Sequence, residues 1–199
     1  MIKVIDRLAG IHNAAFETLE KSLSGWLPGL LARLIFSSVL LAFFWKSAST
    51  KVGDSIFQPA DGAYAQIFPK TLEMLDYDTS GFSAFHTLVV LLGTYAEFIL
   101  PLLILLGLMT RLASLGMIGF IVVMSIVDVF GHNLDAKSIG SLFDRFQDGI
   151  IFDQRLLWIF PLVYLVVKGA GLVSLDGAIG LIRGNEKADP MPGEGTLSR

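Results

Sequence analysis

The stretch LLGTYAEFILPLLILLGLMTR, residues 91–111, decides the fold class. It is almost entirely apolar and matches the ~20 residues that an α-helix needs to cross a bilayer. Glu97 lies inside this run, where an ionisable group costs roughly 2.5–3.5 kcal/mol on insertion scales. The stretch therefore predicts a membrane-spanning helix whose carboxyl group faces protein rather than lipid.

The composition of the whole chain agrees with a membrane protein. Of its 199 residues, 53% are hydrophobic, and the mean hydropathy is +0.66, whereas a soluble domain is typically about 45–50% apolar. The chain has no cysteine, which excludes disulfides, thiolate metal sites and thiol redox chemistry. The formal charge of -3 is too small to indicate nucleic-acid binding. The charged N-terminus lacks the short apolar region of a cleavable signal peptide, so we expect none.

Four apolar segments are long enough to span a membrane. We therefore predict an all-α integral membrane protein built as a four-helix bundle. Pro101 and Pro161 lie inside two of the spans, a position that membrane helices tolerate. The spans are expected at Leu27–Trp45, Leu88–Met109, Leu112–Phe130 and Leu156–Leu175.

The segments outside the spans differ in character. Residues 1–26 place apolar side chains at three- and four-residue steps, which predicts an amphipathic helix in the membrane interface or, equally, a helix packed on the bundle. The loops 46–84 and 131–155 lie on one side of the membrane and are rich in aromatic residues. We expect them to form short helices that cap the outer side. We expect domain boundaries at 1–26, 27–182 and 183–199, the last a disordered tail.

The distribution of charge predicts the orientation. Lysine and arginine are slightly more frequent near the spans on the side that carries both termini, and the long-loop side is rich in aspartate. Because cytoplasmic loops carry the excess of basic residues, both termini are predicted to be cytoplasmic.

Glu97 has two interpretations. It is either a proton or ligand group inside the membrane, or a polar contact that joins two helices. Arg33 is the candidate partner, since it lies ~9 Å from the cytoplasmic end of its span and Glu97 lies ~18 Å from that end. An extended arginine side chain could close most of the gap, which gives the hypothesis of an interior ion pair. In the alternative, Arg33 extends to the lipid headgroups.

A second candidate site lies near the outer ends of the spans. Lys51, His86, Asp128 and His132 are expected to converge there, and such a cluster could bind a quinone headgroup, an anion or a metal. The spacing matches no strong metal motif, so no metal ligand is assigned. Asp128 and His132 are four residues apart and therefore lie on one helix face. For these two residues, a hydrogen bond between their side chains is a simpler expectation than a ligand site.

Several motifs resemble the DoxX family of small four-helix bacterial membrane proteins. The segment 97–111, EFILPLLILLGLMTR, is similar to a family pattern of an acid, an apolar run and Leu-Leu-Gly-Leu-x-Thr-Arg. The segment 169–179, GAGLVSLDGAI, is similar to the family ending Gly-x-Gly-x-x-Ser-Leu-Asp. Arg33 matches a family arginine. FWKSASTKV, residues 44–52, replaces a Gly-x-x-Lys segment, so the resemblance implies that Lys51 rather than Lys46 is the family lysine.

The resemblance implies a function as well as a fold. Family members are similar to the membrane subunit of thiosulfate:quinone oxidoreductase, which makes quinone the expected cofactor and a redox subunit the expected partner. In that hypothesis Arg33 and Glu97 handle protons or polarise a quinone carbonyl. Lys51, His132, Asp128 and His86 then form the cofactor-binding set. The expected location is the bacterial inner membrane.

Two other functions compete with the redox hypothesis. The first is a scaffold or assembly factor whose buried charges fix the packing of the helices. The second is a small carrier for a solute, proton or metal, which would need a homodimer because four helices leave little room for alternating access.

Overall fold

The computed structural model describes residues 2–188, with side chains described for residues 5–183. Within this part the chain is helical and contains no strand. Four helices are long and apolar enough to cross a membrane, which confirms the prediction of an all-α membrane bundle. They are α2 (Leu27–Ser49), α5 (Ala84–Leu106), α6 (Thr110–Ile126) and α8 (Leu156–Lys168). The π-helical turn η2 (Val127–Gly131) extends α6, and the π-helical turn η3 (Ile150–Arg155) precedes α8.

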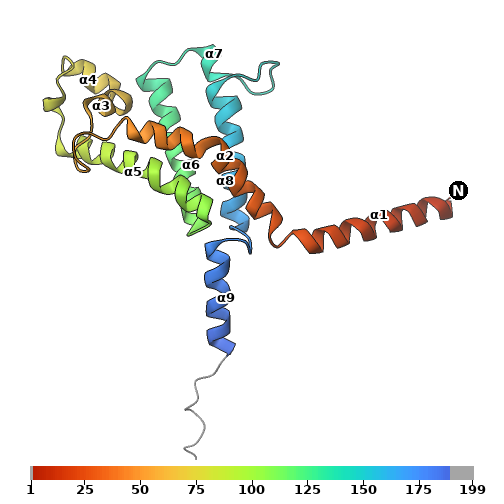
Figure 1. The fold of residues 1–199 in the computed structure, drawn as a ribbon. Helices are drawn as coiled ribbons and strands as arrows, with labels where there is room; N and C mark the ends of the chain where they lie inside the picture. Colours follow the sequence, from red (N-terminus) through yellow and green to blue (C-terminus); the bar gives the residue numbers. More distant parts are fainter. Residues whose placement is uncertain (1, 189–199) are drawn as a thin grey trace, which may run out of the picture.

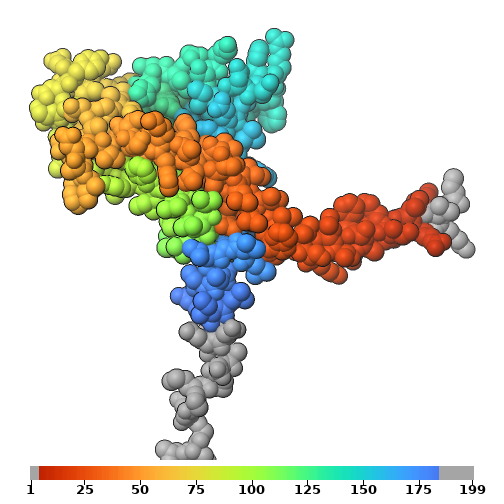
Figure 2. Space-filling model, viewed as in Figure 1, coloured from red at the N-terminus to blue at the C-terminus, as the bar shows by residue number. Residues whose placement is uncertain are grey.

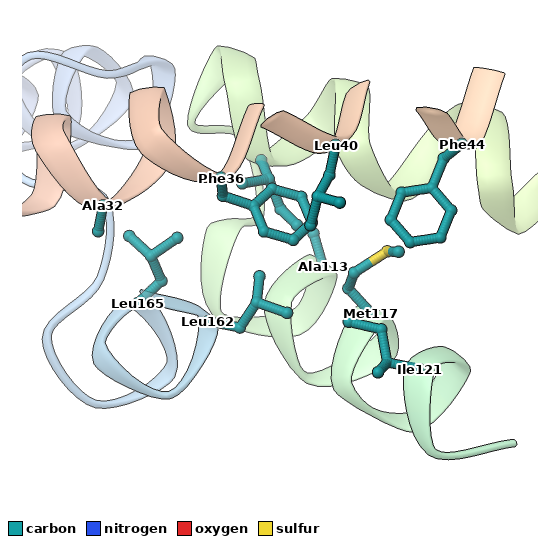
Figure 3. Close-up of a cluster of buried hydrophobic side chains, with 10 residues drawn as sticks. Ala32, Phe36, Leu40, Phe44, Ala113, Met117, Ile121, Leu162 and Leu165 are labelled. Atoms are coloured by element: carbon teal, nitrogen blue, oxygen red, sulfur yellow. The ribbon is translucent and has the colours of Figure 1, made fainter. Parts of the chain in front are cut away.

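The four helices form a closed bundle. Helix α2 packs against α5 and α8, and α6 packs against the same two helices (Figure 1). The core lies where their apolar stripes meet, and it is fully buried at Phe36, Phe44, Met117, Ile121 and Leu162 (Figure 3). Many other large apolar side chains are exposed on the outer faces of the helices, as expected for a surface in contact with lipid.

Short helices cover one end of the bundle, here called the capped end. These are α3 (Asp61–Ile67), α4 (Pro69–Met74), the 3₁₀ turn η1 (Thr79–Gly81) and α7 (Ala136–Ile139). Tyr64 stacks on Phe82 with ring centroids 4.5 Å apart, and its hydroxyl lies 2.8 Å from Thr87 of α5. The cap is therefore packed on the start of α5 rather than free, as its aromatic composition predicted.

Two helices project from the opposite end, here called the termini end. They are α1 (Ile2–Leu23) and α9 (Leu175–Ala188), and both stand clear of the bundle (Figure 2). Every described side chain of α1 from Ile5 to Ser22 is exposed, so the alternative of a helix packed on the bundle is wrong. A place for α1 in the membrane interface stays a prediction.

Several element boundaries differ from the predicted ones. Helix α2 continues four residues past Trp45, and α9 continues past Arg183, where the tail was predicted to begin; residues 189–199 lie outside the described part. The fourth span begins and ends earlier in the chain than predicted: it runs from Ile150 to Lys168, and the predicted span was Leu156–Leu175. It ends there because Gly169 has φ +82, a left-handed conformation that stops a helix.

Candidate functional site: a cavity with a buried ion pair

The local structure of α5 sets the environment of Glu97. Pro101 lies four residues after Glu97 inside the helix, and it has no N–H to donate to the carbonyl of Glu97. The residue after Glu97 is Phe98, and its carbonyl accepts a hydrogen bond from the indole Nε1 of Trp45 at 3.0 Å. The ladder of backbone hydrogen bonds is therefore opened on the turn that carries Glu97.

Lys51 is the partner of Glu97. Its Nζ lies 2.9 Å from both carboxylate oxygens, and each side chain is only 5% exposed. The ammonium also donates to the hydroxyl of Ser47 at 2.6 Å. All three ammonium protons thus have an acceptor, which is what a buried charge requires. This pair joins the turn after α2 to the middle of α5.

The hypothesis of an Arg33–Glu97 ion pair is wrong. The guanidinium of Arg33 donates instead to the carbonyl of Leu105, at 2.9 Å, and to the carbonyl of Val173. Leu105 lies in the last turn of α5, where carbonyls lack a partner within the helix. Arg33 satisfies those carbonyls at the termini end, and Glu97 lies level with Ser47, toward the other end of α2.

A second ion pair joins α6 and α8. Arg155 is buried and donates to the carboxylate of Asp128 and, at 2.9 Å, to the hydroxyl of Ser125. Both charged residues lie on π-helical turns, η2 and η3, which are rare and frequent at functional sites. The sequence did not predict Arg155 as a site residue, because it is the last residue of the predicted loop 131–155. The sequence did contain a signal for this pair, because Arg155 lies at the start of the fourth span and Asp128 at the end of the third.

A cavity of about 570 Å³ brings the two pairs together. Lys51, Glu97, Asp128 and Arg155 all line it, and Gln66 lines it from α3. Apart from Ser47 and His132, the rest of the lining is apolar and comes from α2, α3, α5, α6 and η2. These lining residues are Phe43, Ile67, Val89, Leu92, Gly93, Ala96, Leu100, Gly116, Gly119, Phe120, Val123, Met124 and Val127.

The two histidines of the predicted cluster separate in the structure. His132 lines the cavity, and its Nε2 lies 3.0 Å from the carbonyl of Gln66. His86 does not line it: its ring lies against Phe68 and its Nδ1 is 2.8 Å from the hydroxyl of Ser83. His86, at the start of α5, therefore contacts the cap and is not among the lining residues of this cavity, and its assignment to the cofactor-binding set stays a prediction.

The expected hydrogen bond between Asp128 and His132 is also not formed among the described residues. The intervening chain takes a π-helical turn, so Asp128 turns to Arg155 and His132 turns to the cap. Within the same part of the chain, no three His, Asp or Glu side chains are grouped as they would be around a metal ion.

A comparison with protein-family models identifies the chain. The model described as DoxX matches residues 29–129, just over half of the sequence. The chain belongs to the DoxX family. No curated protein and no solved structure matches it. The DoxX match includes Arg33, Lys51, Glu97 and Asp128 but ends before His132 and Arg155.

The family motifs of this DoxX protein meet at the termini end. Gly107, with φ +67, closes a Schellman motif at the end of α5, in which Leu108 N–H donates to Leu103 at 3.0 Å. A Cβ at Gly107 would lie 2.6 Å from Arg33 Nη1, so only glycine fits there. Asp176 accepts from the N–H groups of Met109 and Thr110 at 2.8 and 2.9 Å.

We call Arg33, Gly107, Thr110 and Asp176 the termini-end cluster. Its contacts tie the turn between α5 and α6 to the link between α8 and α9. Asp176 caps α6 across the turn, whereas Ser174 caps α9 by accepting from the N–H of Gly177 at 3.0 Å. The motif residues at this end thus hold the fold together and do not line the cavity.

The carboxyl group of Asp176 is stabilised in its charged form. Burial by itself would raise its pKa, but the hydrogen bonds from Thr110 and Met109, together with the Arg33 guanidinium, hold the pKa of Asp176 below its usual range. A negative charge at the N-terminus of α6 is also favourable for the helix dipole.

This lowered pKa predicts a loss of stability in acid. The stabilisation is fully present above the ordinary aspartate pKa of about 3.9 and is lost as the pH falls through the lower folded value. We expect the melting temperature in detergent to fall more steeply below about pH 4 for the wild type than for Asp176→Asn. Asp176→Ala, which removes the cap as well, should cost about 1 kcal/mol at pH 7. Equal acid profiles for wild type and Asp176→Asn would contradict the assignment.

Proposed function

We propose that this DoxX protein is a quinone-linked subunit of a membrane oxidoreductase complex, and that the cavity between α2, α5 and α6 receives the quinone head. One observation carries the proposal: the buried Lys51–Glu97 pair and the partly buried Arg155–Asp128 pair both line one cavity whose other walls are mostly apolar. Such a mixture of apolar walls and a few convergent polar groups is typical of a small-molecule site.

The charges of the cavity favour a neutral head. Lys51 is neutralised by Glu97 and Arg155 by Asp128, so a free anion or cation would meet no unpaired opposite charge among these groups. A quinone carbonyl needs hydrogen-bond donors. Lys51 and His132 border the cavity, and the Nε–H of Arg155, which also lines it, is buried without a partner in the described structure. An orphaned buried donor of this kind points to an acceptor that a ligand would bring.

The residues divide into two roles in this proposal. The free Nε–H of Arg155 would donate to one carbonyl oxygen, and Lys51, which lines the cavity with His132, would exchange its hydrogen bond to the Ser47 hydroxyl for the other. The carboxyl groups of Glu97 and Asp128 would hold protons beside these oxygens. When bound, a quinone accepts two electrons and two protons. The electrons would come from a partner redox subunit, since the chain has no cysteine for thiol redox chemistry. Arg33, which lies in the termini-end cluster, has no part in this site.

The proposal includes a place in the cell. We propose the bacterial inner membrane, with both termini in the cytoplasm and the capped end outside, from the distribution of basic residues. The partner subunit would then contact the capped end, where α3 borders the cavity with Gln66 and Ile67. A second copy of the chain is a further candidate partner.

The direct test is quinone binding by the full-length protein in mild detergent. Co-purified quinone is extracted and quantified, and a quinone with a short tail is titrated while tryptophan fluorescence is recorded. We expect stoichiometric binding by the wild type. Lys51→Met/Glu97→Gln should weaken binding at least about tenfold, which corresponds to 1.4 kcal/mol.

Lys46→Met is the matched control for this experiment. Lys46 lies one turn before Lys51 and is exposed, so its replacement should leave quinone binding unchanged. A wild-type protein that neither carries nor binds quinone would contradict the proposed function. So would a double variant that binds as tightly as the wild type, and the buried pair would then be a scaffold contact.

A further inference from the structure

The cavity is open on one side, between α5 and α6. Its lining includes Leu92 and Val123, which are 62% and 59% exposed on the outer surface of the bundle. Gly116 and Gly119 belong to both the lining and the exposed surface. Because α5 and α6 are spanning helices, this surface faces the hydrocarbon of the bilayer and not water.

Small residues keep this opening free. An added Cβ at Gly119 would meet nothing within 4 Å, whereas one at Gly116 would lie 3.3 Å from Leu100. The helices therefore touch at Leu100 and Gly116, and one turn further toward the capped end they leave an apolar groove. Gly93 and Ala96 of α5 line the cavity on the opposite helix, and Glu97 follows directly in the chain. The groove and the ion pair are thus parts of one continuous cavity.

We infer that a ligand with an isoprenoid tail enters this cavity sideways from the bilayer, through the groove between α5 and α6. The inference rests on the proposed function and names the ligand as a long-tailed quinone rather than a water-soluble one. The tail gains little by moving from lipid into the groove, since lipid is as apolar as the groove wall. The groove instead lets the head reach Lys51 and Glu97 while the tail stays in hydrocarbon.

Two substitutions that fill the groove test this route. Gly119→Leu places a side chain in open space and replaces a helix-weakening residue, so the fold should survive. Val123→Phe enlarges a second residue of the groove. Val122→Phe is the matched control, because Val122 is the adjacent valine of α6, is 45% exposed and does not line the cavity.

The readout is the affinity of full-length protein in mild detergent for two quinones with the same head, one with a long isoprenoid tail and one without a tail. Gly119→Leu and Val123→Phe should weaken binding of the long-tailed quinone at least about tenfold and change binding of the tail-less quinone less than about twofold. Val122→Phe should change neither.

The other outcomes separate the inference from the proposed function. If the wild type binds neither quinone, the proposed function fails and this inference fails with it. If the wild type binds both and the groove variants weaken neither, or weaken both equally, the lateral route is wrong and the binding site stands.

Discussion

Lys51→Met alone should lower the free energy of unfolding by about 3–5 kcal/mol, because it leaves the carboxylate of Glu97 buried without its partner. Glu97→Gln alone leaves the ammonium of Lys51 in the same position and should also be strongly destabilising. Both side chains are almost fully buried, so neither unpaired charge can regain its hydration. The measurement is thermal or denaturant unfolding in mild detergent, followed by tryptophan fluorescence.

The double variant Lys51→Met/Glu97→Leu should recover most of that loss. Replacing a buried ion pair by apolar residues of similar volume is often neutral or stabilising, whereas removing one partner is not. Lys46→Met, at an exposed position one turn away, should stay within about 0.5 kcal/mol of the wild type. If Lys51→Met proves as mild as Lys46→Met, the pair is not buried as described.

The same double variant separates the two interpretations of Glu97. A protein that regains its stability but no longer binds quinone would support a ligand-binding role for the pair. A protein that regains both would support the helix-to-helix polar contact and would remove Lys51 and Glu97 from the site. Stability and binding therefore have to be measured on the same sample.

Arg33→Met should also be strongly destabilising, by about 3 kcal/mol, because each hydrogen bond to a charged group is worth about 1.5–3 kcal/mol. The variant leaves the carbonyls of Leu105 and Val173 without their donor. Arg33→Lys should recover less than half of the loss, since an ammonium cannot reproduce the fork of a guanidinium. The measurement is again unfolding in detergent.

Two controls define the role of Arg33. Arg111 is exposed and its side chain makes no hydrogen bond in the described structure, so Arg111→Met should stay within about 0.5 kcal/mol of the wild type. The folded fraction of Arg33→Met should bind quinone within about twofold of the wild type, because Arg33 does not line the cavity. Loss of binding without loss of stability would return Arg33 to the site.

The structure also changes how the family motifs of this DoxX protein are understood. The acid at Glu97 lies in the cavity, but Gly107 and Thr110 of the same motif segment and Asp176 of the second segment lie in the termini-end cluster. Two motif residues, Lys51 and Glu97, thus line the cavity, and the motif residues of the termini-end cluster stabilise the fold. Substitutions at Gly107 and Asp176 should therefore be judged by stability before activity.

The sequence by itself determined the fold class, because the requirement for about 20 apolar residues per span is a local property of the chain. It also determined that Glu97 faces protein, since the cost of a carboxyl group in lipid does not depend on the partner. The cap was predictable for a similar reason, as loops with so many aromatic residues cannot remain in water. These conclusions need only composition and position along one helix.

Only the tertiary structure decided which charges meet. Helix α2 extends to Ser49, and the turn that follows it places Lys51 beside the middle of α5. Lys51 and not Arg33 therefore reaches Glu97. The π-helical turns rotate Asp128 toward Arg155 and away from His132. Pairing depends on the relative depth and rotation of two helices, which side-chain packing along their whole length sets. A displacement of one turn, 5.4 Å, is enough to exchange one partner for another.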